Sequence, residues 1–215
     1  MNHSFSATLF EEMPVVGIMR GIPPVAMHKI ADLYLESGLT TLEITMNSAG
    51  ALPTLKALSR KYGTELNIGA GTVLNLEELE NALSFGAQFI VTPVLNKTVV
   101  DRCVEKRIPV FPGAYTPTEI YQAWEMGADM VKVFPASGLG ADYIKNVKAP
   151  MNFLKLLPTG GIDLENCLDF FQAGASGIAL GSSLFPRTFI EHENWTALSA
   201  LFEQFRNRIR EFRRG

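Results

Sequence analysis

The chain alternates short apolar runs with longer segments in which apolar and polar residues follow a helical period. The apolar runs recur about every 20 to 26 residues and are typical of strands buried on both faces of a parallel sheet. They predict eight strands, at residues 15–19, 42–45, 66–70, 89–91, 108–111, 130–134, 153–157 and 178–180. The segments between them predict helices at residues 24–37, 51–62, 76–85, 97–106, 117–126, 141–147, 164–173 and 195–213.

Glycines and prolines recur at matching joints of these units. A glycine follows four of the predicted helices, where a left-handed C-cap favours this residue: Gly38, Gly86, Gly127 and Gly174. A proline, which cannot continue a ladder, ends four predicted strands: Pro93, Pro112, Pro135 and Pro158. The repeated unit predicts an α/β fold, a single-domain (β/α)8 TIM barrel over residues 1–215 with eight parallel strands and a short N-terminal helix.

An open doubly wound sheet is the alternative architecture. Its dinucleotide-binding version needs the spacing G-x-G-x-x-G. Gly69 and Gly71 match the first two glycines, but Leu74 stands where the third should be. The barrel is therefore favoured, and the absence of a linker or a shift in composition indicates one domain.

Composition excludes several classes of function. The chain has 215 residues, 47% of them hydrophobic, and a formal net charge of −3. This charge offers no long-range attraction for nucleic acid or an anionic membrane, so we expect neither as a partner. Cys103 and Cys167 lie far apart in predicted helices and are expected to be buried thiols of a soluble, cytoplasmic protein. The scattered histidines predict no metal site.

Lys132 is the exception within its strand, because it stands in the apolar run Met130-Val131-Lys132-Val133-Phe134. Burial disfavours an ammonium, lowers its pKa and leaves part of the amine free to attack a ketone as a nucleophile. The alternative is a lysine that reaches solvent from a strand edge. Lys155 is a rival nucleophile, because the sequence from it to Pro158 has the same spacing.

Glu43 occupies an equivalent position between Leu42 and Ile44. Alternation along a strand places Thr41, Glu43 and Thr45 on one face, as it does Met130, Lys132 and Phe134. If both faces point inward, a carboxylate and an amine meet in a low-dielectric interior. A purely structural ion pair is the alternative, but such pairs add little stability over apolar residues.

Two glycine-rich turns follow the last two predicted strands, Thr159-Gly160-Gly161 and Gly181-Ser182-Ser183. Barrels often bind phosphate at these two places, although glycines also serve ordinary tight turns. Arg20 ends the first strand and could grip a carboxylate, or could be a surface residue. Thr72 could donate its hydroxyl to the same carboxylate, or cap the next helix.

Five motifs, in order and at similar spacing, resemble the 2-keto-3-deoxy-6-phosphogluconate (KDPG) aldolases over residues 14–185. They are Glu43-Ile44-Thr45, Gly69-Ala70-Gly71-Thr72-Val73-Leu74-Asn75, Phe111-Pro112-Gly113 with Thr116-Pro117-Thr118-Glu119, Lys132-Val133-Phe134-Pro135, and Pro158-Thr159-Gly160-Gly161-Ile162. The resemblance implies a class I aldolase on a (β/α)8 barrel, a homotrimer that needs no metal and no other cofactor. Its partners would be a phosphorylated 2-keto-3-deoxy sugar acid and pyruvate.

The resemblance also assigns roles to residues. Lys132 would form the Schiff base and Glu43 would be the general acid/base. Thr72 and Pro93 would line the pyruvyl end, and Phe134 the space beside the imine. The phosphate would be bound by Gly160, Gly161, Gly181 and Ser182.

Asn47 departs from the family pattern, because many members carry there an arginine that binds the substrate carboxylate. The phosphogalactonate branch is similar in having Asn-Ser at this place and Arg-Gly after the first strand, as Asn47-Ser48 and Arg20-Gly21 are here. We therefore expect Arg20 to bind the carboxylate. Thr159 instead resembles the gluconate branch, so the preferred epimer is left open.

Other activities remain open at this stage. The galactonate-derived sugar acid and 4-hydroxy-2-oxoglutarate are alternative aldolase substrates. A phosphate-binding isomerase or epimerase would use the same loops without needing Lys132. A non-catalytic sugar-phosphate binding protein would need neither Lys132 nor Glu43.

Overall fold

The computed structural model describes residues 4–214. Its strands are β1 (Val15–Met19), β2 (Thr41–Thr45), β3 (Asn67–Gly71), β4 (Ile90–Val91), β5 (Val110–Phe111), β6 (Gly113–Ala114), β7 (Val131–Val133), β8 (Leu156–Pro158) and β9 (Ile178–Leu180). Its helices are α1 (Ala7–Glu12), α2 (Pro24–Glu36), α3 (Ala51–Tyr62), α4 (Leu76–Ser84), α5 (Lys97–Lys106), α6 (Pro117–Glu125), α7 (Gly140–Lys148), α8 (Cys167–Gln172), α9 (Arg187–Glu191) and α10 (Trp195–Phe212), with a 3-10 turn at Ala136–Gly138. Every predicted strand and helix overlaps an observed one.

The predicted closed barrel of eight strands is wrong. The strands form a six-stranded sheet in the order β5-β4-β3-β2-β1-β9 and a three-stranded sheet in the order β6-β7-β8, and every pair is parallel. The predicted fifth strand, residues 108–111, corresponds to β5, and a further short strand, β6, follows beyond Pro112, which has no N–H to donate. β5 pairs with β4, and β6 pairs with β7. Between β8 and β9 the pairing is reduced to a single bridge, from Thr159 to Ala179.

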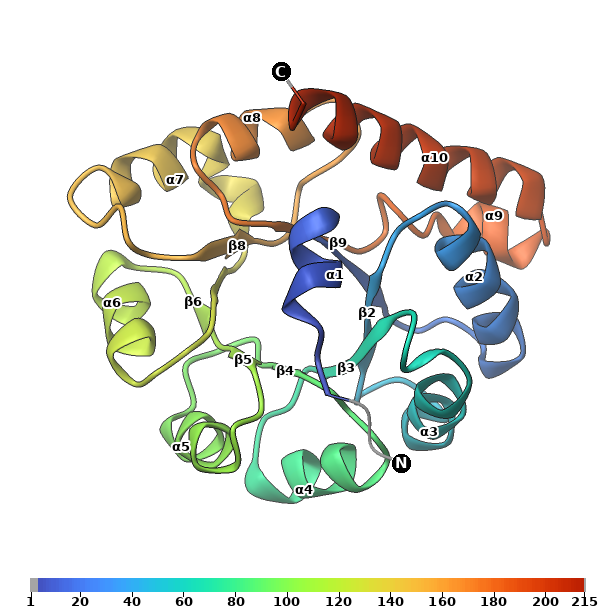
Figure 1. The fold of residues 1–215 in the computed structure, drawn as a ribbon, viewed down its shortest axis with the longest axis horizontal. Coiled ribbons are helices and arrows are strands. Elements are labelled where there is room, and N and C mark those ends of the chain that lie inside the picture. The colour runs from blue at the N-terminus through green and yellow to red at the C-terminus, as the bar shows by residue number, and fades with distance from the viewer. Residues whose placement is uncertain (1–3, 215) are drawn as a thin grey trace.

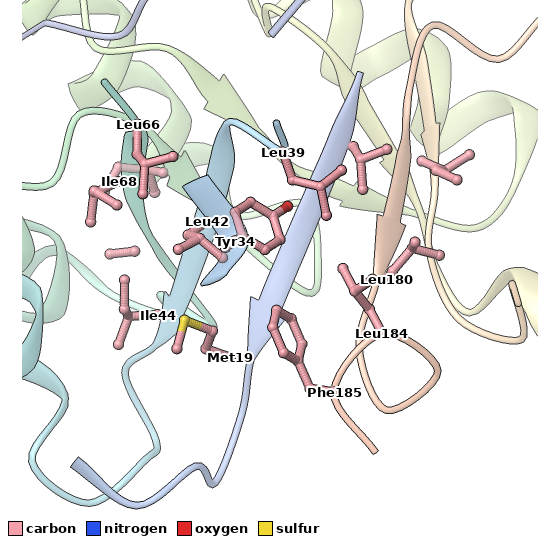
Figure 2. Packing of buried hydrophobic residues seen from close by; sticks show 14 of the residues in the cluster. Met19, Tyr34, Leu39, Leu42, Ile44, Leu66, Ile68, Leu180, Leu184 and Phe185 are labelled. Atoms are coloured by element: carbon pink, nitrogen blue, oxygen red, sulfur yellow. The ribbon is translucent and has the colours of Figure 1, made fainter. Parts of the chain in front are cut away.

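Helices surround the strands, and α1 crosses the middle of the molecule (Figure 1). The larger apolar core lies between the strands and the helices, and Figure 2 shows its part around β1, β2 and β9. Leu42 and Ile44 point into this outer core. Tyr34 of α2 is fully buried there and donates its hydroxyl to the carbonyl of Thr41 at 3.0 Å. Gly17 leaves room for this ring, since a Cβ there would lie 2.9 Å from the Tyr34 hydroxyl oxygen.

A second apolar cluster fills the space enclosed by the strands. The tilted rings of Phe89 and Phe111 pack at a centroid distance of 5.4 Å, and Phe5 and Phe10 pack on them from the N-terminal segment. Asn67, at the start of β3, accepts from the N–H of Ser6 and donates to its carbonyl, at 2.7 and 3.0 Å. The N-terminal segment therefore covers the amino ends of the strands, which leaves their carboxyl ends for a site.

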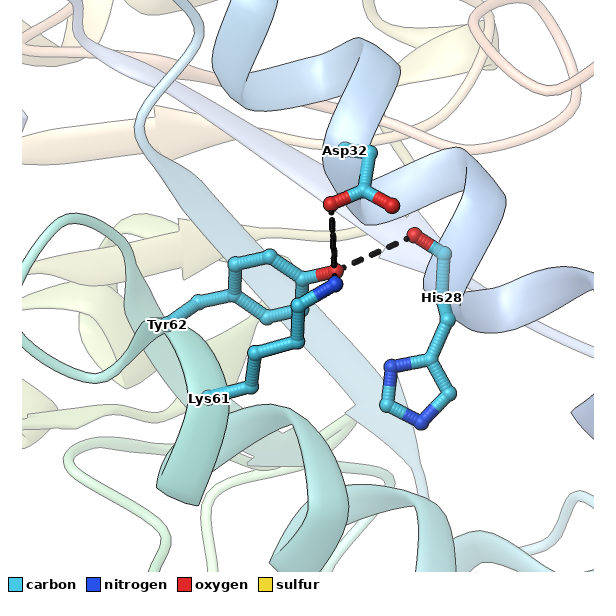
Figure 3. A network of polar contacts seen from close by, with 4 residues as sticks. All are labelled: His28, Asp32, Lys61 and Tyr62. Carbon is cyan, nitrogen blue, oxygen red and sulfur yellow. Dashed lines mark hydrogen bonds and ion pairs between the residues drawn. The ribbon is translucent and has the colours of Figure 1, made fainter.

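A polar network joins α2 to α3 on the outside of the molecule (Figure 3). Tyr62 donates to Asp32 at 2.7 Å and to the carbonyl of His28 at 3.3 Å, while Lys61 pairs with Asp32 at 3.1 Å. The Tyr62 hydrogen bond, together with the charge of Lys61, lowers the pKa of Asp32. Because the ion pair is about half exposed, it adds little to the free energy of unfolding.

Both cysteines are free and buried, as predicted, and burial raises the pKa of Cys103 to about 12. No helix among residues 4–214 combines the length and the apolar character that crossing a membrane requires.

Phe202 holds the last helix, α10, against the rest of the structure. Its fully buried ring packs edge-on against Tyr34 and Phe185, at 5.4 and 5.6 Å between centroids. Phe202→Ala should lower the free energy of unfolding by about 3–5 kcal/mol, because it leaves a cavity. Urea denaturation measures this. Val25→Ala, at a residue 90% exposed, should change it by less than about 0.5 kcal/mol, and an equal loss in both variants would contradict the prediction.

Candidate active site

Lys132 points into the space enclosed by the strands. Its neighbours Val131 and Val133 belong to the outer core, so alternation along β7 turns Lys132 inward. The residue is only 2% exposed, and its Nζ lies 5.3 Å from the centroid of the Phe134 ring. An amine this deep in the protein is held where water solvates it poorly.

Glu43 also points inward, because Leu42 and Ile44 on either side point outward (Figure 2). The residue is fully buried, and neither carboxylate oxygen accepts a hydrogen bond from residues 4–214. Gly71 of β3 makes room for it, since a Cβ at that position would lie 1.7 Å from Oε1. A buried carboxylate without a partner is costly, so its retention suggests a chemical role.

The charges of Glu43 and Arg20 both affect the pKa of Lys132. Burial lowers the pKa of Lys132; the negative charge of Glu43 raises this pKa, and the positive charge of Arg20 lowers it. Arg20 and Lys132 line the same cavity, and Glu43 and Lys132 both turn inward from their strands. Burial outweighs the carboxylate, so more of the amine is uncharged near neutral pH than in an ordinary lysine.

Arg20 follows β1 and reaches across the end of β2 toward β3. Its Nη2 lies 3.4 Å from the Thr72 hydroxyl oxygen. Thr72 has a φ of +58°, which is unusual for a β-branched residue. This conformation places its hydroxyl beside the guanidinium.

A cavity of about 750 Å³ opens at the carboxyl ends of the strands. Ile18, Arg20 and Lys132 lie on one part of its wall, and the two glycine-rich turns lie on another. A group of predicted residues shares this wall: Phe134, Thr159, Gly160, Gly161, Gly181 and Ser182. The cavity therefore joins a buried amine to turns with accessible backbone.

Geometry requires the two glycines of the first turn. Gly160 and Gly161 have φ values of +95° and +71°, which favour glycine. A Cβ on Gly161 would lie 2.6 Å from the Ser137 Cα. At Gly181 a Cβ would meet nothing within 4 Å, so its backbone borders open space. Backbone at these turns can approach a ligand closely.

The chain matches the family described as "Aldolase: KDPG and KHG aldolase" over residues 8–201. It belongs to this aldolase family. The resemblance seen in the motifs is thereby confirmed, and the protein is an aldolase, a carbon–carbon lyase.

Individual relatives fall in both branches of the family. A 2-dehydro-3-deoxy-6-phosphogalactonate aldolase of Escherichia coli (strain K12) is 35% identical over 81% of this chain and 85% of the relative. A 2-dehydro-3-deoxy-phosphogluconate aldolase of Haemophilus influenzae is 37% identical over 81% of this chain and 82% of the relative. A solved structure described as native KDPGal has a TM-score of 0.89 and 30% identity, covering 99% of this chain and 100% of its own.

Four predicted site residues of this aldolase are not on the cavity wall: Glu43, Asn47, Thr72 and Pro93. Glu43 is fully buried, and Thr72 lies beside Arg20, which is on the wall. Pro93 is half-buried and its carbonyl lies against Gly113, where a Cβ would come within 2.3 Å. Asn47 is exposed and does not line the cavity.

The two candidate lysines are separated by the structure. Lys155 is exposed before β8, whereas Lys132 is buried and faces the cavity. Their similar sequence spacing hid this difference, because Lys155 stands one residue ahead of the β8 strand. Burial lowers the pKa of Lys132.

Sequence reasoning missed residues at the mouth of the cavity. Arg187 and Glu191 of α9 line it and form an ion pair at 2.5 Å, and Asp163 lies on the same wall. The sequence feature that could have identified these residues is their position shortly after the two glycine-rich turns. Asp163 and Glu191 do not make a metal site, since residues 4–214 hold no group of three or more His, Cys, Asp or Glu arranged for an ion.

Competitive acetylation with trace acetic anhydride, read by peptide mass spectrometry across pH, tests the charge balance. Lys132 should titrate below the ordinary value of 10.5, because burial disfavours its charged form. Glu43→Gln removes the charge that raises this pKa, so the midpoint should move to still lower pH. Glu203→Gln, on the exposed side of α10, should leave the midpoint unchanged. A midpoint that rises in Glu43→Gln would contradict the proximity of the two groups.

Proposed function

We propose that this aldolase cleaves 2-keto-3-deoxy-6-phosphogluconate to pyruvate and glyceraldehyde 3-phosphate through a Schiff base on Lys132. The observation that carries the proposal is the buried amine, whose pKa is lowered by burial and which faces the cavity near a buried carboxylate. An amine in this environment is suited to attack a ketone. Family membership supports the same reaction class.

The first half of the reaction forms the imine. The lone pair of the uncharged Lys132 Nζ attacks the C2 carbonyl and gives a carbinolamine. Loss of water from this carbinolamine gives a protonated imine, which can accept an electron pair. The Phe134 ring, beside the amine, shields this centre from solvent on one side.

The second half breaks the C3–C4 bond. Glu43, directly or through one water, takes the proton from the C4 hydroxyl, and the C4–O bond becomes the aldehyde carbonyl. The bonding pair of C3–C4 moves into the imine and leaves an enamine on Lys132. The enamine is protonated at C3 by the same carboxyl group, and hydrolysis of the imine releases pyruvate and restores the amine.

Binding groups for the two ends of the substrate would come from different strand ends. Arg20 would bind the C1 carboxylate, with Thr72 beside it and Pro93 at the pyruvyl end. The turns at Gly160, Gly161, Gly181 and Ser182 would bind the phosphate through backbone N–H groups, with Thr159 between the two ends. The exposed Asn47 is left without a contact to the substrate in this arrangement.

The galactonate-derived substrate is the second candidate. It is favoured by Arg20, which occupies the cavity wall while Asn47 does not, and by the 35% identity to a phosphogalactonate aldolase. Thr159, buried beside the cavity with its hydroxyl donated to the Leu157 carbonyl at 3.1 Å, is the feature that resembles the gluconate branch. Activity on 4-hydroxy-2-oxoglutarate, which carries no phosphate, would use Lys132, Glu43 and the carboxylate end of the site without the phosphate-binding turns.

The homotrimer implied by the resemblance stays a prediction, as does a cytoplasmic location. Leu74 and Val94 support an interface, because they are exposed in neighbouring loops that Asn96 joins by donating to the Leu74 carbonyl at 2.9 Å. Light scattering should then give three times the chain mass of 23.6 kDa.

Borohydride added in the presence of pyruvate should trap a covalent adduct on Lys132, identified by peptide mass spectrometry. Lys132→Ala should abolish both the adduct and the cleavage, because no other buried amine is available among residues 4–214. Lys155→Ala is the matched control and should retain both. A phosphate-binding isomerase would survive Lys132→Ala, and an adduct on Lys155 would contradict the assignment.

Cleavage of the gluconate- and galactonate-derived substrates, followed by pyruvate release, tests the epimer and the carboxylate site together. Arg20→Ala should lower kcat/KM for either substrate by about 10- to 100-fold, as expected when a charge-assisted hydrogen bond is lost. Asn47→Ala should change it by less than about threefold. If Asn47→Ala were the more damaging change, the assignment of the carboxylate to Arg20 would be wrong.

A further inference from the structure

The end of β2 and the loop after it contain a hydroxyl pair that the proposed reaction does not use. The Thr45 and Ser48 hydroxyl oxygens lie 2.7 Å apart, and the Ser48 N–H donates to the Thr45 carbonyl at 3.0 Å. Thr45 is fully buried, two residues beyond Glu43 on the same face of β2. Ser48 is therefore fixed to the end of the strand that carries the carboxylate.

Ser48 also holds the neighbouring turn. Its Oγ accepts a hydrogen bond from the N–H of Gly21 at 2.9 Å. Gly21 has a φ of +63° and directly follows Arg20. This bond thus fixes the backbone at the base of the Arg20 side chain, in the turn that leads from β1 to α2.

The tip of the same side chain is held separately. Arg20 Nη2 lies 3.4 Å from the Thr72 hydroxyl, and Thr72 adjoins Gly71, which packs against Glu43. The register pairs Met19 with Ile44 and Ile44 with Ala70, so the guanidinium extends over the end of β2 from one neighbouring strand to the other. Arg20 is anchored at its base by Ser48 and at its tip by Thr72.

The position of the guanidinium matters to the amine as well as to a carboxylate. The positive charge of Arg20 acts on Lys132, and both side chains line the same cavity. Arginine has several rotatable bonds, so a turn free to move would spread its charged end over a wide volume. The hydrogen bond from Gly21 to Ser48 reduces the volume over which the guanidinium can move.

We propose that Ser48 is a positioning residue that aligns Arg20 for the carboxylate of the ketone substrate. The inference rests on the proposed function, because it assumes that Arg20 binds this carboxylate. Ser48 touches neither the substrate nor Lys132 in this arrangement, and it acts only through the turn at Gly21. Its hydroxyl thus serves the site from the loop position next to Asn47.

Two ketones separate positioning from general stability. Pyruvate carries a carboxylate, whereas hydroxyacetone does not, and both can form an imine with an amine. The half-saturating concentration for borohydride trapping on Lys132 is measured for each. Ser48→Ala should raise this concentration for pyruvate by about 5- to 30-fold, the effect of one lost hydrogen bond, and leave it unchanged for hydroxyacetone.

Further variants test whether Ser48 acts through Arg20. In an Arg20→Gln background, Ser48→Ala should add less than about twofold for pyruvate, because the group it positions is gone. Ser48→Thr keeps the hydroxyl and should restore trapping to within about threefold of the original enzyme. Ser84→Ala is the matched control, since the exposed Ser84 also makes one local bond, to the Asn81 carbonyl at 2.8 Å.

Three results would overturn the proposal. They are an equal loss for both ketones, an unchanged response to pyruvate in Ser48→Ala, and a full additional loss in the Arg20→Gln background. If the original enzyme traps no pyruvate at all, the proposed function fails and the inference with it. Trapping that is normal and insensitive to Ser48→Ala overturns the positioning role alone.

Discussion

The site depends on one electrostatic constraint, an amine and a carboxylate buried in the same interior. Lys132 is almost fully buried, and Glu43 has no hydrogen-bond partner among residues 4–214. Burial of either group alone is unfavourable, and burial of both is only partly offset by their attraction. Burial lowers the pKa of Lys132 more than the carboxylate raises it, so the amine gives up its proton more readily than an ordinary lysine does.

The surrounding fold allows this constraint because its two apolar cores are separate. The outer core, between strands and helices, carries most of the buried apolar residues and therefore most of the stability (Figure 2). The inner cluster is smaller and aromatic, and it lies toward the amino ends of the strands, where the N-terminal segment packs on it. Polar groups can therefore occupy the carboxyl ends of the strands while the outer core keeps its packing.

Alternation along strands explains why much of the site could be predicted. Glu43 and Lys132 each stand between apolar residues that face outward, so a period of two was enough to bring them to one interior. The barrel prediction failed for a different reason: the unit spacing located eight strands but carried no information on the ninth, β6, or on how the strands pair across Pro112. A single residue without an N–H divides the sheet there.

Contacts between loops were beyond the reach of sequence patterns. Ser48 is recognisable only once Gly21 and Thr45 are seen beside it, because the three come from separate turns and strand ends. Asn47 was selected by its position in a family motif, yet it is its neighbour that makes the contacts. Arg187 and Glu191 belong to a short helix that no periodicity revealed.

The aromatic residues at the amino ends of the strands affect the order in which products can leave the cavity. Phe5, Phe10, Phe89 and Phe111 occupy that end, while the described opening lies at the glycine-rich turns. In the proposed reaction the pyruvyl fragment is the inner one and the phosphorylated aldehyde stands between it and solvent. The two products must then depart in a fixed sequence, aldehyde before pyruvate, and synthesis in the reverse direction must load the ketone first.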